Sequence, residues 1–477
     1  MTKTVLNALG ETLYYSGTSK AWISATGAGT ALSGTAANDS MYGDSAVNVT
    51  MSGGAGDDVY YLYSSINRAA EAAGQGIDTV DTWMSYTLPD NIENLRVTGD
   101  NRFAFGNDLD NIISGSSSRQ TFDGGAGNDV LTGGGGADTF IVAKGNGSDL
   151  ITDFSADDKI RLDGYSFTSF EQVGNSLTQE GPNLRLDLGD GDSLVFAGTT
   201  ADDLSADQFA LSLDRSVLTK TFGDEFNALS LNNGTSGTWD ANFHWAPDQG
   251  SSLPTNGESQ WYVNPLYAPT AGYSPFSVSN GALTITAKNT PDAISDAVNG
   301  YDYVSGMLNT YSTFSQTYGY FEMRADMPTD QATWPAFWLL PEDGSWPPEI
   351  DVVEMRGQDP NTVHVSAHSN ETGKQTTQTS AISVPSTEGF HTYGMLWTEE
   401  EIVWYFDDVA IASAETPSDM HDPMYLLVNL AVGGAAGKPG DLSGGAKMVI
   451  DYIHAYEIDD DAAPTSSISS ASDDGLV

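Results

Sequence analysis

The sequence predicts an all-β protein in which a parallel β-roll precedes a β-sandwich or jelly roll. Nine-residue repeats rich in glycine and aspartate occur in residues 1–213, and strands with a period of two residues recur in residues 214–458. Long helical periodicity is scarce, which argues against an α/β barrel because its strands alternate with helices. We therefore expect these two domains, followed by an acidic, serine-rich tail at residues 459–477.

The composition limits the classes of partner. The chain has 477 residues, and its 65 acidic side chains outnumber the 18 basic ones, so the formal net charge is −47. Phosphate binding needs a basic surface, and we therefore expect no nucleic-acid partner. Carboxylate oxygens are the ligands that calcium prefers, which makes Ca²⁺ the expected ion. No apolar run is long enough for a transmembrane helix, so we expect no membrane insertion.

Three segments fit the pattern Gly-Gly-x-Gly-x-Asp-x-apolar-x. Two are in tandem, at residues 124–132 and 133–141, and the third covers residues 53–61. Glycine permits the positive φ of a tight turn and leaves carbonyl oxygens free to face an ion, while the aspartate adds a charged oxygen. The expected calcium ligands are Asp58, Asp129, Asp138, Gly125, Gly127, Gly134 and Gly136.

A hairpin is predicted after the repeats, where residues 183–188 and 193–196 alternate around a Gly-Asp-Gly-Asp turn. We interpret this hairpin as a cap on the roll. Its acidic turn lacks the twelve-residue layout of an EF-hand, so we interpret it as solvated.

The repeats resemble the RTX repeats of proteins that bacterial type I secretion systems export. The resemblance implies structural Ca²⁺, an extracellular location, and the type I secretion machinery as a partner. It also implies an uncleaved secretion signal near the C-terminus, which agrees with the lack of a visible signal peptide in residues 1–7. The tail at 459–477 fits such an address, and a disordered terminus is the alternative interpretation.

Three carboxylates lie within six residues of the second domain: Glu349, Asp351 and Glu354. Alternation along a strand places Glu349 and Asp351 on one face and sends Glu354 to the other. A bulge at Val352 and Val353 would add one residue and return Glu354 to the face of the other two. Hydrolysis of a glycosidic bond needs such a pair of carboxyl groups. A solvated acidic edge is the alternative in a protein this acidic.

Aromatic side chains flank these carboxylates. Indole rings stack on the flat C–H faces of sugars, so Trp334 and Trp346 are candidate sugar-binding residues. Trp338 is a further candidate, with the core, beside Phe337, as its alternative place. Arg324 alternates with core-type residues along its strand, and we expect it to reach the cleft.

The region around the carboxylates resembles family 16 glycoside hydrolases, in the bulged form of laminarinase-like members. The resemblance covers most of residues 217–458 and rests on motifs in the family's order, at residues 222–226, 305–307, 318–324, 334–338, 349–354, 429–434 and 451–453. It implies a concanavalin-like β-jelly roll and a retaining mechanism, for which the two carboxyl groups lie about 5–5.5 Å apart. Combined with the upstream repeats, it is similar to secreted rhizobial glycanases that cut the exopolysaccharide succinoglycan.

The resemblance assigns roles to individual residues. Glu349 is expected to be the nucleophile, Glu354 the general acid/base, and Asp351 the residue that orients the nucleophile. Negative neighbours raise the pKa of a carboxyl group, so Glu349 and Asp351 help to keep Glu354 protonated. The resemblance also places Glu258 near the cleft and His368 beside the acid/base, among the substrate-binding residues. For His368, an ordinary strand histidine is the alternative interpretation.

Two further assignments keep an alternative. Asp451 matches a position at which family members hold a structural calcium, and a solvated strand aspartate is the other interpretation. His364 and His368 have the i, i+4 spacing that binds zinc on a helix when a glutamate follows the first histidine. They lie in a strand-like segment without that glutamate, which disfavours a metalloprotease.

The sequence therefore predicts a secreted, monomeric endo-β-glycanase that cuts a succinoglycan-type exopolysaccharide or a β-1,3/1,3-1,4-glucan. The alternative is a non-catalytic, calcium-dependent carbohydrate-binding protein or adhesin that uses the sandwich as a lectin. The presence of all three carboxylates favours the enzyme. An RTX protease or toxin would need a His-Glu-x-x-His motif or long apolar stretches, which the sequence lacks.

Overall fold

A computed structural model gives the structure of the chain, and it describes residues 2–6, 12–16, 21–24, 31–43, 48–246, 248, 250–384 and 387–458. The chain divides into two compact units, with the boundary between Ser212 and Leu213. The described residues form strands and loops almost throughout, and they contain one α-helix, α1 (Phe170–Asn175). None of the helices in these ranges has the length and apolar character needed to span a bilayer. The predicted tail at 459–477 lies outside the described residues.

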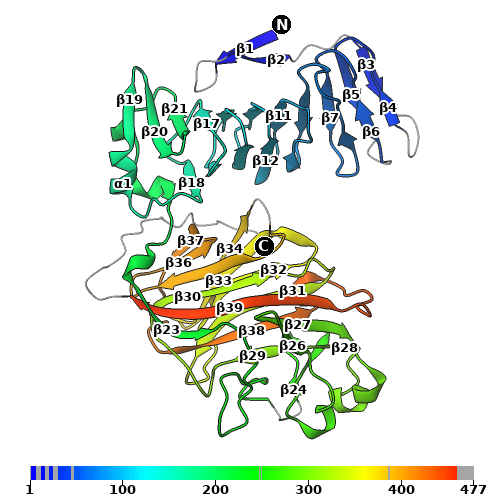
Figure 1. Cartoon of the computed structure of the whole chain (residues 1–477), viewed down its shortest axis with the longest axis vertical. Coiled ribbons are helices and arrows are strands. Elements are labelled where there is room, and N and C mark those ends of the chain that lie inside the picture. The colour runs from blue at the N-terminus through cyan, green and yellow to red at the C-terminus, as the bar shows by residue number, and fades with distance from the viewer. Residues whose placement is uncertain are drawn as a thin grey trace. The chain divides into compact units, whose positions relative to one another are not determined.

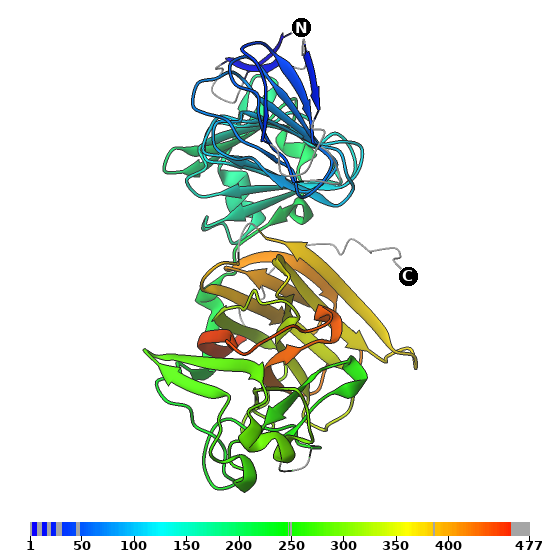
Figure 2. The same cartoon turned by 90° about the vertical axis from the view of Figure 1, so that its right-hand side faces the viewer.

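The first unit is a roll whose strands follow one another in chain order, from blue to green in Figure 1, and Figure 2 looks along the stack. Parallel pairing joins the successive coils. The larger sheet contains, in spatial order, β19 (Leu177–Glu180), β20 (Asn183–Gly189), β21 (Asp192–Phe196), β17 (Ser148–Ile151), β15 (Val130–Thr132), β13 (Ile112–Ser114), β11 (Asn94–Val97), β9 (Thr79–Thr82), β7 (Val59–Leu62), β5 (Asp39–Tyr42) and β3 (Ala21–Ser24).

Two smaller parallel sheets complete the roll. One contains β10 (Tyr86–Thr87), β12 (Arg102–Asn107), β14 (Gln120–Gly125), β16 (Thr139–Ala143), β18 (Lys159–Asp163) and β22 (Phe209–Ala210). The other contains β4 (Ala31–Ser33), β6 (Thr50–Ser52) and β8 (Arg68–Ala69), and an antiparallel pair, β1 (Thr2–Leu6) and β2 (Thr12–Ser16), precedes them.

The apolar residue of each repeat fills the interior of the roll. Tyr60, Leu131 and Phe140 are fully buried there, and the rings of Phe122 and Phe140 stack at 5.2 Å. The predicted hairpin is present, because β20 pairs antiparallel with β21, and β21 extends the larger sheet beside β17. Each coil alone would expose its apolar side chains, so burial depends on the stacking of neighbours.

The second unit is a sandwich of two mainly antiparallel sheets (Figure 1). The larger sheet contains β24 (Gly250–Ser251), β25 (Gln260–Val263), β28 (Tyr303–Ser305), β27 (Ala282–Asn289), β39 (Ala446–Ile458), β30 (Gly319–Asp326), β35 (His391–Trp397), β36 (Glu401–Phe406) and β37 (Val409–Glu415), with β23 (Leu218–Asp224) and β26 (Phe276–Ser279) attached to it. The smaller sheet contains β29 (Met307–Asn309), β38 (Met424–Val432), β31 (Thr333–Pro341), β32 (Glu349–Arg356), β33 (Asp359–Ser369) and β34 (Thr376–Ser383).

The main core lies between these two sheets. Phe321 and Met323 of β30 meet Phe337 of β31 and Val428 of β38 in one cluster of fully buried side chains. Alternation along each strand supplies these residues, since every second side chain faces the opposite sheet. The other face of the smaller sheet is therefore free to form a cavity.

Strand β32 contains the predicted bulge. Asp351 pairs with Trp338 of β31, and Val353 pairs with Phe337. Val352 is therefore the extra residue, which pairs with no residue of β31. Val352 and Val353 both point into the core, where they are 2% and 0% exposed. Two successive inward side chains change the phase of the alternation, which returns Glu354 to the outer face.

Deleting Val352 should leave the second unit folded with Glu354 still on the cavity side. The shortened run Glu349-Ile350-Asp351-Val353-Glu354 alternates strictly, so Ile350 and Val353 still face the core and the three carboxylates still share one face. Like Val352→Ala, the deletion removes buried apolar contacts and should cost about 1–3 kcal/mol. Thermal unfolding of both variants tests this, and a deletion that unfolds the unit while Val352→Ala stays folded would contradict it.

Candidate active site and calcium sites

A cavity of about 560 Å³ opens on the smaller sheet of the second unit. Strands β31, β32, β33 and β38 form its base, and segments between residues 244 and 258 and between residues 344 and 346 form its walls. Its lining includes eight residues that the sequence predicted: Glu349, Asp351, Glu354, Trp334, Trp338, Trp346, His368 and Glu258.

The two outer carboxylates each accept a hydrogen bond from an indole. Trp346 Nε1 donates to Glu349 Oε2 at 2.6 Å, and Trp334 Nε1 donates to Glu354 Oε1 at 2.8 Å. Asp351 lies between them in the sequence and is 3% exposed. The indoles thus fix the orientation of both glutamates, and the 57% exposure of Trp346 leaves most of its ring accessible.

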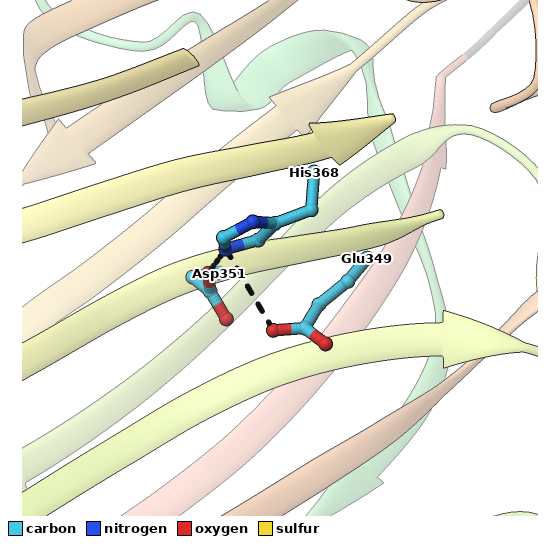
Figure 3. Close-up of side chains that lie close together, drawn as sticks. All are labelled: Glu349, Asp351 and His368. Atoms are coloured by element: carbon cyan, nitrogen blue, oxygen red, sulfur yellow. Dashed lines mark hydrogen bonds and ion pairs between the residues drawn. The ribbon is translucent and has the colours of Figure 1, made fainter. Parts of the chain in front are cut away.

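His368 approaches the carboxylates from the neighbouring strand β33 (Figure 3). Its Nε2 lies 3.1 Å from Asp351 Oδ2 and 3.9 Å from Glu349 Oε1, and its Nδ1 lies 2.9 Å from Thr377 Oγ1. In the strand register His368 stands opposite Glu349, and His364 stands opposite Glu354. The nearest contacts of His368 are therefore with Asp351 and Glu349, and it also lies close enough to Glu354 to lower the pKa of that carboxyl group.

Burial raises the pKa of all three carboxyl groups above the usual range. The charge of Asp351 raises the pKa of Glu349 further, and the charge of Glu354 raises that of Asp351. His368 and the Trp346 hydrogen bond act in the opposite direction on Glu349. Such opposed effects allow neighbouring carboxyl groups to differ in protonation near neutral pH.

Two other predicted residues have defined partners in the cavity. Glu258 accepts hydrogen bonds from Gln260 Nε2 at 2.6 Å and from the Leu253 N–H at 3.2 Å, and burial raises its pKa to about 7. Trp338 lines the cavity and donates from Nε1 to Asn429 Oδ1 at 2.7 Å. Its neighbour Phe337 is the core residue of the pair, as alternation along β31 requires.

The residues that line the cavity and that the sequence reasoning missed include His244, Trp245, Tyr425 and Asn429. His244 stacks on Tyr311 with ring centroids 4.0 Å apart, and Trp245, which is 50% exposed, stacks on Phe243 at 4.6 Å. The run Phe-His-Trp at residues 243–245 was a visible aromatic signal. Asn429 lies within one of the motifs that carried the resemblance, but nothing in its strand pattern distinguished it.

Arg324 and Asp451 do not belong to this cavity. Arg324 lies on β30 of the larger sheet, and its Nη1 is 2.5 Å from Asp451 Oδ2 on β39. The alternation that we used for Arg324 was right, but its outward face belongs to the other sheet, so its predicted role in the cleft is wrong. The guanidinium of Arg324 already balances the charge of the Asp451 carboxylate. Among the described residues, neither group of three potential metal ligands includes it, which does not support the predicted calcium role.

The glycine-rich turns of the roll fit calcium. Gly125 and Gly127 have φ of 83° and 132°, and Gly134 and Gly136 have φ of 100° and 102°, so all four need glycine. A Cβ on Gly124 would lie 2.0 Å from Asp129 Oδ2, and one on Gly133 would lie 2.4 Å from Asp138 Oδ2. The carboxylates therefore lie directly against the turn backbone, as ligands of a shared cation would.

Buried oxygens without a hydrogen-bond partner mark the same turns. Asp58 Oδ2, Asp129 Oδ2 and Glu71 Oε2 are of this kind. Oxygen atoms of Asp58, Glu71 and Asp78 lie within 4.8 Å of one another. Glu71, which the sequence reasoning missed, also accepts hydrogen bonds from the N–H of Gly53 at 2.7 Å and from Tyr60 Oη. A cation would satisfy oxygens that the protein itself leaves unpaired.

A row of carboxylates beneath exposed indoles, in a cavity on a β-sandwich, is the arrangement of a glycoside hydrolase. Comparison with family models agrees: residues 264–454 match the glycosyl hydrolases family 16, and residues 105–140 and 114–149 match the RTX calcium-binding nonapeptide repeat. The chain belongs to glycosyl hydrolase family 16 and carries RTX repeats that bind structural Ca²⁺. It is a glycan-hydrolysing enzyme, and the adhesin alternative is not favoured.

Two relatives from Rhizobium meliloti (strain 1021) match nearly the whole chain. The endo-1,3-1,4-beta-glycanase ExsH is 70% identical over 97% of this chain and 99% of its own length. The endo-1,3-1,4-beta-glycanase EglC is 65% identical over the same shares. Among solved structures, the laminarinase from Rhodothermus marinus is similar with a TM-score of 0.42 and 29% sequence identity, over 50% of this chain and 98% of that one.

The stability of the roll should depend on pH in opposite ways with and without calcium. Burial raises the pKa of Asp58 and of Asp138 to about 7 in the calcium-free protein. In the unfolded chain the value is about 3.9, so the folded state binds more protons, and stability falls as pH rises from about 4 to 7. Calcium binds the deprotonated form, so its stabilising effect grows over that range.

Thermal unfolding followed by circular dichroism between about pH 4.5 and 8, in calcium-depleted and calcium-containing buffer, measures this dependence. The unfolding midpoint should fall with rising pH only in the depleted buffer. A fall of the same size in both buffers would contradict the assignment of these aspartates as ligands.

Proposed function

We propose that this protein is a retaining endo-β-glycanase in which Glu349 is the nucleophile and Glu354 the general acid/base. The single observation that supports these roles is the bulge at Val352, which gathers three carboxylates on the cavity side of β32. Trp334 and Trp346 add indole rings where sugar rings would stack.

In the first step a Glu349 oxygen attacks the anomeric carbon, and the bond from that carbon to the glycosidic oxygen breaks. Glu354 donates its proton to the departing oxygen, so the released sugar leaves as an alcohol. Burial raises the pKa of both glutamates, which suits Glu354 to hold a proton. At Glu349 this effect is opposed by His368 and by the Trp346 hydrogen bond, which favour the ionised form that attacks, and at Glu354 His368 and the Trp334 hydrogen bond act in the same direction.

In the second step water enters opposite the glycosyl-enzyme ester. Glu354, now ionised, takes a proton from this water while the oxygen bonds to the anomeric carbon. The ester bond to Glu349 breaks, and the sugar leaves with its original anomeric configuration. Two displacements on one carbon restore the starting stereochemistry.

Asp351 and His368 position the nucleophile in this proposal. The imidazole Nε2 of His368 lies within 3.9 Å of one oxygen from each of Glu349 and Asp351. Thr377 contacts the other ring nitrogen at 2.9 Å and so fixes the ring plane. A histidine held in this way contacts both carboxylates from one side and so fixes how they are placed relative to each other.

The proposed substrate is a polysaccharide with β-1,3 and β-1,4 linkages, such as a mixed-linkage β-glucan or a succinoglycan-type exopolysaccharide. The names of the two full-length relatives support the linkages, as endo-1,3-1,4-beta-glycanases. We further propose extracellular action after type I export, which the RTX repeats support.

Replacing each glutamate should separate the two roles. Glu349→Gln should lower turnover about 10³-fold or more on every substrate, because no ester can form. Glu354→Gln should lose polysaccharide cleavage but retain substantial cleavage of aryl glycosides, whose leaving group needs no proton. Exposed Glu399→Gln is the matched control. If Glu349→Gln and the native protein turned over polysaccharide equally fast, Glu349 could not be the nucleophile.

Reducing-end release measured on laminarin, lichenan, succinoglycan and agarose tests the substrate class. We expect cleavage of lichenan or succinoglycan and none of agarose. Cleavage of agarose alone would overturn the linkage assignment while leaving the hydrolase itself intact.

A further inference from the structure

Two ladders of hydrogen bonds run along the roll, one on each edge. In each ladder, the main-chain N–H of the residue that ends one turn donates to the side chain of the equivalent residue in the next coil. On one edge the main-chain N–H of Asn111 donates to Asp129 Oδ1 at 2.7 Å, and the N–H of Asp129 donates to Asp149 Oδ1 at 3.0 Å. On the other edge the N–H of Gln120 donates to Asp138 Oδ1 at 2.8 Å, and the N–H of Asp138 donates to Asp158 Oδ1. Asn111 and Gln120 therefore occupy positions equivalent to calcium-ligating aspartates.

The same ladder continues toward the N-terminal side of Asn111. The N–H of Asp39 donates to Asp58 Oδ1 at 2.7 Å, that of Asp58 to Asp78 Oδ1 at 2.8 Å, and that of Asp78 to Glu93 Oε2 at 2.8 Å. The strand register places Glu93 beside Asn111, since the next residues, Asn94 and Ile112, are paired. Along this edge, four acidic residues are followed by one amide and then by two more acidic residues. In order they are Asp39, Asp58, Asp78, Glu93, Asn111, Asp129 and Asp149.

The Asn111 side chain fills the space between its own turn and the preceding one. Its Nδ2 donates to the carbonyl of Glu93 at 3.1 Å and to Asn107 Oδ1 at 3.2 Å. The Nδ2 of Asn107 donates to the carbonyls of Pro89 and Ile92, both at 2.8 Å. Two amides thereby supply N–H donors to three backbone carbonyls that face across the turn.

Gln120 does the same on the opposite edge. Its Nε2 donates to the Gly99 carbonyl in the preceding turn at 2.8 Å and to Ser116 Oγ at 3.0 Å, while its Oε1 accepts from the Ser116 N–H at 3.0 Å. Both ends of this amide are satisfied within the protein.

Asp58 and Asp129 lack such internal satisfaction, whereas Asp158 Oδ2 accepts hydrogen bonds from the N–H and Oγ of Ser155. Asp58 and Asp129 each keep one buried oxygen without a partner, and each is fully buried. A carboxylate has no N–H to donate, so neighbouring carbonyls and the second oxygen need a cation. An amide of nearly the same shape meets the carbonyls with its own hydrogen atoms and needs none.

We propose that the side-chain amides of Asn107, Asn111 and Gln120 replace calcium between the central turns of the roll. Calcium binding is then divided into two blocks, one around Asp39, Asp58 and Asp78 and the other around residues 129–158. The segment from residue 88 to residue 123 holds its coils together without ions. It also interrupts the row of like charges, which lowers the repulsion along the calcium-free roll.

Hydrogen exchange on the full-length protein, with and without calcium, tests the division directly. Strands β11, β12 and β13 should stay protected after calcium removal, while β7 and β9 on one side and β15 and β17 on the other should lose protection. Uniform loss of protection over all these strands, or uniform retention, would overturn the proposal.

Converting the amides to acids gives a second test. Asn111→Asp and Gln120→Glu remove a donor and add a charge at nearly constant shape, so each variant should unfold at a lower temperature without calcium. In calcium, each should regain stability and hold more bound calcium per chain, by metal analysis after dialysis, than the native protein. Asn175→Asp, at an exposed site at the end of α1, is the matched control.

These measurements distinguish an amide that takes the place of a calcium ion from an amide that makes an ordinary structural hydrogen bond. If the acid variants lose the same thermal stability with and without calcium, and bind no more calcium, the amides only stabilise the turn and the proposal fails. If they fail to fold in both conditions, the exchange measurement on the native chain still decides between the two.

Discussion

One unpaired residue in β32 connects the core of the sandwich to its chemistry. Ile350, Val353 and Met355 must face the opposite sheet, because they lie in the main cluster of buried side chains. With strict alternation, Glu354 would face that cluster as well, and a buried carboxylate without a partner costs more than the core gains from regular pairing. The bulge removes the conflict, because leaving Val352 unpaired lets two successive valines face inward and lets the same strand contribute three carboxylates to the cavity.

Both units contain acidic groups packed closely where water is scarce, and they stabilise these groups differently. In the roll, each carboxylate accepts a main-chain N–H from the neighbouring coil, and calcium meets the remaining oxygens. In the cavity, indole N–H groups and His368 face the carboxylates instead. A tightly bound cation there would neutralise a group that has to attack carbon, whereas an indole orients the oxygen and leaves it reactive. Structural and reactive carboxylates therefore call for different partners.

Much of this arrangement could be predicted from the sequence because its signals are local. The nine-residue period gave the coils of the roll, and two valines between Asp351 and Glu354 gave the bulge. Predictions failed where the deciding contact joins distant segments. Alternation showed that Arg324 points away from the core, but it does not show which of the two sheets carries the strand. Likewise His244 and Tyr425, 181 residues apart, meet only because a loop folds over β38.

The two glutamates differ in their surroundings more than in their own position. Glu349 receives a hydrogen bond from an indole that is more than half exposed, and it lies near His368. Glu354 accepts its hydrogen bond from Trp334. On the neighbouring strand it is paired with His364, and burial lowers the pKa of that histidine. Burial raises the pKa of both glutamates, and His368 on the same strand lowers it at both. The register of β33 against β32 thus gives the two glutamates different nearest neighbours on one face of the sheet, with His368 opposite Glu349 and His364 opposite Glu354.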